Sequence, residues 1–149
     1  MWKAFKDKAL LAWQLTLPEW LALVEAWWIL LGFYLALWWV SYDRLATTPR
    51  PILNEIPDES SVLVFAQRLQ RVVGMAARLH LLPIACLVKA LTLRFMLGRR
   101  GIEAQLRIGA NKAATGLRAH AWVEIQGQPI GESEDLTERF KVMDVQINR

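Results

Sequence analysis

The chain has 149 residues, about the length of one domain, and its 54% apolar content excludes a disordered protein. A single cysteine excludes an internal disulfide framework and a Cys-rich zinc site, and with two histidines a zinc site within the chain would need carboxylates as well. The formal charge of +4 is too small to indicate a nucleic-acid partner. We therefore expect chemistry from protein side chains alone, with no metal and no cofactor.

Tryptophan is concentrated at the start of the chain, where seven of the eight tryptophans lie within the first 39 residues. From Trp20 to Val40 the only charged residue is Glu25, so the segment is long and apolar enough to span a bilayer. A glutamate in mid-span would cost about 2.5–3.5 kcal/mol, and Trp13, Trp20 and Trp27 share one helical stripe. We favour a pair of apolar helices packed on protein or lying on a membrane surface, with a transmembrane span as the alternative.

Prolines divide the first half of the chain. Pro18 follows Thr16 in a pattern typical of a helix start. Three prolines between residues 46 and 60 exclude a helix there and predict a linker. We therefore predict an apolar helical N-terminal region over 1–57 and a core over 58–149.

The core is expected to contain two helices followed by a small antiparallel sheet. Apolar residues recur at helical spacing from Val62 to Leu82, and a second helix is expected from Pro83 to about Leu97, ending at Gly98. Strict alternation then predicts strands at 102–109 and 118–126, a third strand at 128–131, and a short helix with a tail at 135–145. The predicted fold class is α+β, with the second helix packed on the sheet.

Cys86 falls in the first turn of the second core helix. A lone cysteine is most often a small buried apolar residue. However, the first turn of a helix carries unpaired N–H groups and the positive end of the macrodipole, which favour the reactive thiolate. The same N–H groups can stabilise an oxyanion, so Cys86 is a candidate nucleophile.

His120 lies on the strand face opposite the aliphatic residues, and a helix packed over that face would bring it to Cys86. The second ring nitrogen then needs an acceptor that orients the imidazole. The hairpin that follows places Glu132 alongside His120, so Glu132 is the leading candidate, with Asp135 as the alternative. Glu124 lies about 13 Å along the strand from His120 and is expected to be structural or substrate-facing.

Three blocks of sequence, in this order, resemble the leader peptidases of bacterial lasso-peptide biosynthesis. The blocks are Pro-Ile-Ala-Cys-Leu-Val-Lys-Ala-Leu-Thr-Leu from residue 83, Arg-Arg-Gly-Ile-Glu-Ala-Gln-Leu-Arg-Ile-Gly from residue 99, and Ala-His-Ala-Trp-Val-Glu-Ile-Gln-Gly from residue 119. The apolar motif that begins at residue 17 is also similar to the N-terminal region of these peptidases. They belong to the transglutaminase-like, papain-related cysteine peptidases, so the resemblance implies a transglutaminase-like core.

The resemblance also implies roles and partners. Cys86 would be the nucleophile, His120 the base and Glu132 the acid, with Asp135 as the alternative because many of these peptidases carry aspartate at the acid position. The implied activity is cytoplasmic removal of the leader from a ribosomally made precursor peptide. Residues 1–60 do not look like the fused leader-recognition module, so the resemblance is to the stand-alone form, which acts with a separate leader-binding protein and a macrolactam-forming cyclase.

Two other functions remain open from the residues alone. A transglutaminase-type acyl transferase would use the same three groups, since an acyl-enzyme can be opened by water or by an amine. A non-enzymatic, membrane-associated adaptor would dock its partner through the Trp-rich helices and would leave Cys86 far from His120. In either enzyme, residues 1–45 are expected to form a docking or membrane-surface platform.

Overall fold

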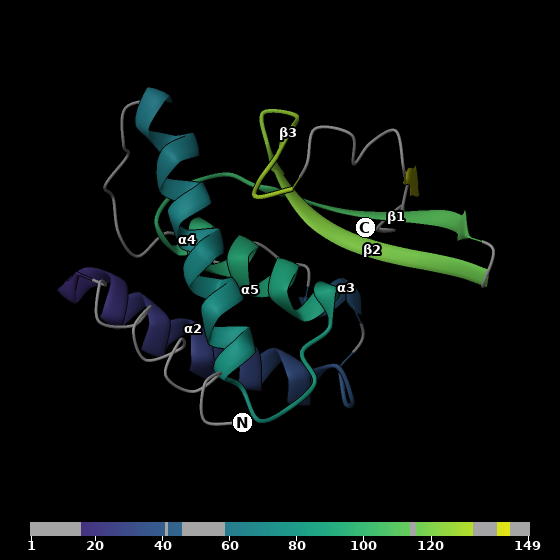
Figure 1. Ribbon diagram of the computed structural model, residues 1–149, viewed down its shortest axis with the longest axis horizontal. Helices are drawn as coiled ribbons and strands as arrows, with labels where there is room; N and C mark the ends of the chain where they lie inside the picture. Colours follow the sequence, from purple (N-terminus) through teal and green to yellow (C-terminus); the bar gives the residue numbers. More distant parts are fainter. Residues whose placement is uncertain (1–15, 41, 46–58, 114–115, 133–139, 144–149) are drawn as a thin grey trace, which may run out of the picture.

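The computed structural model describes residues 16–40, 42–45, 59–113, 116–132 and 140–143. The helices are α2 (Leu17–Ala36), α3 (Tyr42–Leu45), α4 (Glu59–Leu79) and α5 (Cys86–Arg99), and the strands are β1 (Gln105–Ala113), β2 (Gly116–Ile125), β3 (Gln128–Pro129) and β4 (Lys141–Met143). Figure 1 shows the long helices gathered beside one curled antiparallel sheet, which is the predicted α+β class. Trp13, the three-proline linker up to residue 58 and Asp135 lie outside the described residues.

Helix α2 begins at the predicted start. Glu19 Oε2 accepts hydrogen bonds from the backbone N–H and the hydroxyl of Thr16, each at 2.8 Å, and Pro18 occupies the first turn, where a missing N–H costs little. These two bonds, the backbone one first, hold the pKa of the Glu19 carboxyl below its usual value. Within the described part of the N-terminal region there is one long helix, where a pair of helices was expected.

One side of α2 packs on α4 and α5. Leu23, Ala26 and Leu30 are buried in the same apolar core as residues of those helices, so α2 shares that core. Glu25 forms ion pairs with Arg99 at 3.0 Å and with Arg100 at 2.8 Å, which ties α2 to the end of α5. By length and composition α2 would suit a membrane span, but Glu25, the acidic residue in its middle, is paired with two arginines of the protein.

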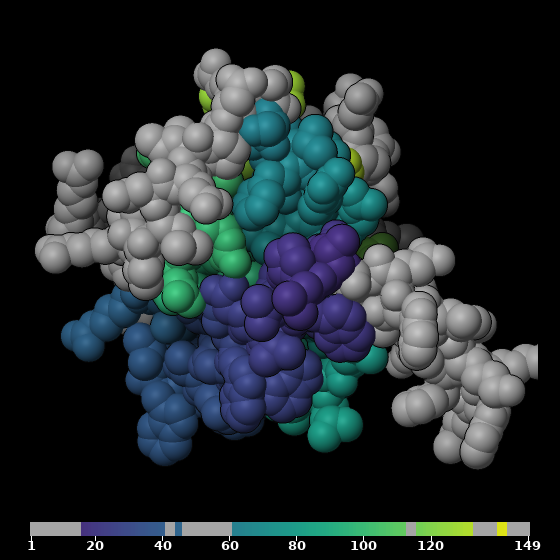
Figure 2. Space-filling view, turned by 90° about the vertical axis from the view of Figure 1, so that its left-hand side faces the viewer, coloured from purple at the N-terminus to yellow at the C-terminus, as the bar shows by residue number. Residues whose placement is uncertain are grey.

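The opposite side of α2 forms an exposed apolar surface, which we call the outer stripe. Its exposed members recur at helical spacing and continue past the end of the helix: Leu17, Trp20, Leu21, Val24, Trp28, Leu35, Trp38 and Trp39. Figure 2 shows α2, in purple to blue, lying open on the lower part of this face below α4. The outer stripe carries no charged side chain.

Helix α5 begins three residues later than predicted. Pro83 lies in the non-helical segment that follows α4, and Ala85 is extended, with φ −71° and ψ 160°, so the first helical residue is Cys86. The predicted position of Cys86 in the first turn is therefore correct, and it is the very first residue of the helix.

The sheet has the strand order β3-β2-β1-β4, with all neighbours antiparallel. Strand β1 begins at Gln105, three residues after the predicted start at residue 102. The reason is that the backbone N–H of Ile102 donates to the carbonyl of Leu97 and so closes the end of α5. The prediction of a short helix with a tail over 135–145 is wrong for residues 141–143. These residues form β4, which pairs with the edge of β1.

Helix α5 covers the aliphatic face of β2, where the sequence argument expected it over the face of His120. Ala121, Val123 and Ile125 are buried in one core with Val88 and Leu97 of α5. The other face of β2 is buried as well from Ala121 onward, so the strand is covered on both sides. Helix α2 lies before the proposed boundary at residue 57 and yet shares this core. The division of the chain into two parts at residue 57 stays a prediction.

Candidate active site

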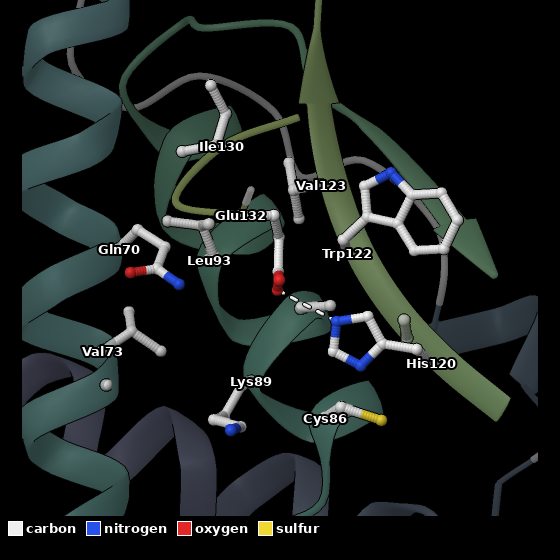
Figure 3. A pocket seen from close by; sticks show the side chains of 13 residues that line it. Gln70, Val73, Cys86, Lys89, Leu93, His120, Trp122, Val123, Ile130 and Glu132 are labelled. Carbon is white, nitrogen blue, oxygen red and sulfur yellow. Dashed lines mark hydrogen bonds and ion pairs between the residues drawn. The ribbon is translucent and has the colours of Figure 1, made fainter. Parts of the chain in front are cut away.

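Cys86, His120 and Glu132 line one pocket between α4, α5 and the sheet. Cys86 comes from the start of α5, His120 from the middle of β2, and Glu132 from the turn after β3. The structure thus places on one pocket three residues that lie up to 46 positions apart in the sequence. In Figure 3 these side chains face a common space.

Cys86 is half-buried at the N-terminus of α5. Its N-cap, Ala85, offers no side-chain hydrogen bond to the first turn, and the first helical backbone bond runs from the N–H of Lys89 to the carbonyl of Ala85 at 3.2 Å. The N–H groups before Lys89 therefore have no partner within the helix and point toward the start of the helix. Figure 3 shows the sulfur of Cys86 on the same side as the His120 ring.

His120 contacts Glu132 through the ring nitrogen Nε2, which lies 3.0 Å from Oε1 of the carboxylate. Both side chains are 26% exposed, so the pair is partly shielded from water. A carboxylate only accepts hydrogen bonds, so this contact favours the tautomer with the proton on Nε2. The other nitrogen, Nδ1, is then the acceptor, and Figure 3 shows it on the ring edge nearer to Cys86.

The chain before Glu132 is shaped by a glycine. Gly131 has φ +70°, a conformation that side chains rarely adopt, and a Cβ there would lie 2.5 Å from Cδ of Gln70. The backbone N–H of Ile130 donates to the carbonyl of Val123 at 2.9 Å, which continues the pairing of the hairpin past β3. Together these features turn the chain so that Glu132 reaches back to the histidine.

Glu124 is a buried carboxylate, not a substrate-facing one. It accepts hydrogen bonds from Nε1 of Trp122 at 2.9 Å and from Nε of Arg107 at 3.0 Å. Sequence reasoning left its role open as structural or substrate-facing. The shared face of Trp122 and Glu124, two residues apart on a strand, was the signal that these two side chains meet.

Two polar residues of the pocket were not singled out by sequence reasoning. Lys89 lies one turn after Cys86 on α5, and Gln70 reaches the pocket from α4. The three-residue spacing of Cys86 and Lys89 was a usable signal, because such residues share a helix face. Nothing in the sequence connected Gln70 to the site, since it comes from a separate helix.

The arrangement offers the groups that covalent acyl chemistry needs. Cys86 provides a nucleophile beside unpaired N–H groups, and His120 provides a base that Glu132 orients. An acyl carbon attacked by sulfur at this position would place its oxygen near the start of α5.

Comparison with known proteins gives the family of the chain but no individual relative. No curated protein and no solved structure matched the sequence. A family described as the transglutaminase-like superfamily matches residues 27–145, from the middle of α2 to beyond β4. The match includes Cys86, His120 and Glu132, and it agrees with the helices and small antiparallel sheet described above. The chain therefore belongs to the transglutaminase-like superfamily.

Proposed function

We propose that this protein is a cysteine peptidase that removes the leader from a ribosomally made lasso-peptide precursor. The observation that carries the enzymatic part is the 3.0 Å contact of His120 with Glu132 in the pocket that also contains Cys86. The family supports cysteine-based acyl chemistry. The choice of substrate rests on the resemblance of the three sequence blocks to leader peptidases.

The proposed reaction has two steps. In the first, His120 Nδ1 takes the proton of the Cys86 thiol, the sulfur attacks the carbonyl carbon of the scissile amide, and His120 returns the proton to the departing amine. In the second, His120 takes a proton from water and the resulting hydroxide attacks the thioester carbon. The C–S bond then breaks, the peptide leaves as its carboxylic acid, and His120 returns the proton to the sulfur. Glu132 stabilises the imidazolium in both steps and remains ionised. The N–H groups at the start of α5 stabilise each tetrahedral oxyanion.

Mass spectrometry of a cognate precursor incubated with this protein and its leader-binding protein tests the proposal. We expect one cleavage between leader and core peptide, and we expect it to be lost in Cys86→Ala and His120→Ala. Cleavage that survives Cys86→Ala would overturn the mechanism. An added primary amine distinguishes the alternative activity, since a transglutaminase-type enzyme would release the acyl group as an amide of that amine.

We assign the outer stripe of α2 to the separate leader-binding protein. The stripe is rich in tryptophan, which is enriched where protein interfaces bind most strongly. The two acidic residues of α2 are both used within the protein, Glu19 at the helix start and Glu25 with two arginines. The stripe therefore presents apolar aromatic surface without a charge that must be desolvated.

Surface variants test this assignment without removing α2 from the core. Replacing Trp28 and Trp39 with serine should weaken binding of the leader-binding protein by at least about tenfold, as loss of interface tryptophans usually does. The control is Leu81→Ser, which changes a residue outside the stripe that is about as exposed as Trp39. Unchanged protein binding, together with loss of flotation with anionic vesicles, would assign the stripe to a membrane surface instead.

A further inference from the structure

His120, Trp122 and Glu124 form a row of side chains on one face of β2. The row runs from the partly exposed histidine into the protein, where Trp122 is 2% exposed and Glu124 is 6% exposed. The proposed reaction uses only the first member of this row. The other two members include a buried carboxylate, and burial of a charged group is costly unless the group is paired and hydrogen-bonded.

Glu124 has two partners that hold it in place. One oxygen accepts from the indole N–H of Trp122, and the other accepts from Arg107, which is paired with Trp122 across β1 and β2. At 2.9 Å, the bond to Glu124 restrains the rotation of the indole about its side-chain bonds.

The indole in turn lies against the histidine. The rings of Trp122 and His120 are nearly parallel, with 19° between their planes and 6.1 Å between their centroids. The ring of Phe140 approaches His120 as well, at 5.5 Å between centroids. Gly109 lies opposite His120 on β1, and a Cβ there would come within 2.9 Å of both Trp122 and Phe140, so the aromatic groups fill all the available space.

We propose that Glu124 is a positioning residue for His120, acting through Trp122. Two constraints then set the imidazole: the aromatic packing fixes the plane of the ring, and the hydrogen bond to Glu132 fixes its rotation and tautomer. Nδ1 is held toward Cys86 without any direct bond from Glu124 to the histidine. The inference rests on the proposed role of His120 as base, and it extends the site by a residue that touches neither substrate nor nucleophile.

NMR of the imidazole nitrogens in the full-length protein tests this inference directly. The chain has two histidines, so His80, which stacks on Trp27 away from the pocket, is an internal control in the same spectra. In the wild type we expect His120 as a single tautomer with the proton on Nε2. Glu124→Leu removes both acceptors, so the plane of the His120 ring is no longer held and its hydrogen bond to Glu132, which selects the tautomer, is weakened. We therefore expect a mixture of His120 tautomers and unchanged His80 signals in this variant. Glu124→Gln should restore the wild-type spectrum, because its amide oxygen still accepts from the indole. Glu103→Gln, at an exposed glutamate, is the matched control.

The rate of Cys86 alkylation by iodoacetamide, measured against pH, is the second readout. We expect Glu124→Leu to lower the rate by up to about 10²-fold and to change the shape of its pH profile, since small displacements of a reacting group have effects of this size. If Glu124→Leu does not fold, Trp122→Phe replaces it, because that variant keeps an aromatic ring but loses the bond to Glu124.

Two results separate the inference from the proposed function. A folded variant with lower thermal stability but wild-type His120 signals and an unchanged pH profile would show that Glu124 is merely structural, and the inference would be overturned. Slow alkylation of the wild type, with His120 still held in one tautomer that Glu124→Leu disrupts, would instead reject the peptidase mechanism and leave the positioning role intact.

Discussion

Substitution of Gly109 by alanine is a demanding test of how the sheet supports the histidine. Gly109 is buried on β1, directly opposite His120. A Cβ at this position would lie 2.8 Å from Cη2 of Trp122 and 2.9 Å from Cβ of Phe140. Since one contact is the buried indole and the other is a Cβ close to the backbone, neither neighbour can move aside like the end of a flexible side chain.

The size of the effect follows from these distances. Carbon atoms in contact prefer about 3.5–4.0 Å, so the indole must retreat by roughly 0.7–1.2 Å. Overpacking of this kind costs about 1–3 kcal/mol, of which the reduced freedom of the unfolded chain offsets about 0.4–1 kcal/mol. The melting temperature should therefore fall by several degrees, at roughly 2–4 °C per kcal/mol for a chain of this length. Because the indole packs beside His120, alkylation of Cys86 should slow by up to about 10²-fold even where the protein is folded.

The assay compares Gly109→Ala with Gly32→Ala in thermal unfolding and in alkylation of Cys86. A Cβ at Gly32 has no neighbour within 4 Å, and alanine in a helix interior is favoured by up to about 1 kcal/mol, so this control should be neutral or stabilising. We expect Gly109→Ala to lose both thermal stability and Cys86 reactivity. We expect Gly32→Ala to lose neither. If Gly109→Ala is as stable and as reactive as the wild type, the close packing of Trp122 against β1 does not support the site.

Three further predictions follow from the site and from the start of α2. Cys86→Ala should abolish leader cleavage but leave the unfolding temperature nearly unchanged, because only a half-buried sulfur is removed; mass spectrometry and calorimetry check the two parts. Glu132→Gln should reduce the cleavage rate more than Asp135→Asn, because an amide can donate to the imidazole and so favours the wrong tautomer; the reverse order would move the acid to Asp135, and no effect of either would indicate that Cys86 acts with the histidine alone. The lowered pKa of Glu19 means that its ionised form stabilises the fold. This contribution should be complete above the pKa of the unfolded chain and should disappear as the pH falls through the lower pKa of the folded state. Comparing the unfolding free energy of the wild type and Glu19→Gln across acid pH measures it, and a difference that persists at the lowest pH would contradict the assignment.

Local patterns in the sequence were enough to locate the elements that carry the site. The helix start at Thr16 and Pro18 is set by capping groups within one turn, and the alternation around His120 is a property of the strand itself. The position of Cys86 in a first turn follows from the end of one helix and the beginning of the next. The approach of Glu132 to His120 could be predicted because a tight hairpin limits where the returning chain can lie.

Only the tertiary structure decided which groups meet across long distances in the sequence. Glu25 has its partners 74 and 75 residues further along the chain, and nothing in the local pattern distinguishes a paired glutamate from one in a lipid span. The alternation of β2 shows two faces but does not say that α5 covers the aliphatic one, nor that the other face is buried too and encloses Glu124. Strand β4 likewise forms because the edge of β1 offers unpaired backbone groups. The residues of β4 alone do not indicate that this edge lies beside them. Periodicity reports the geometry of one segment, whereas burial and charge pairing depend on which segments fill the same space.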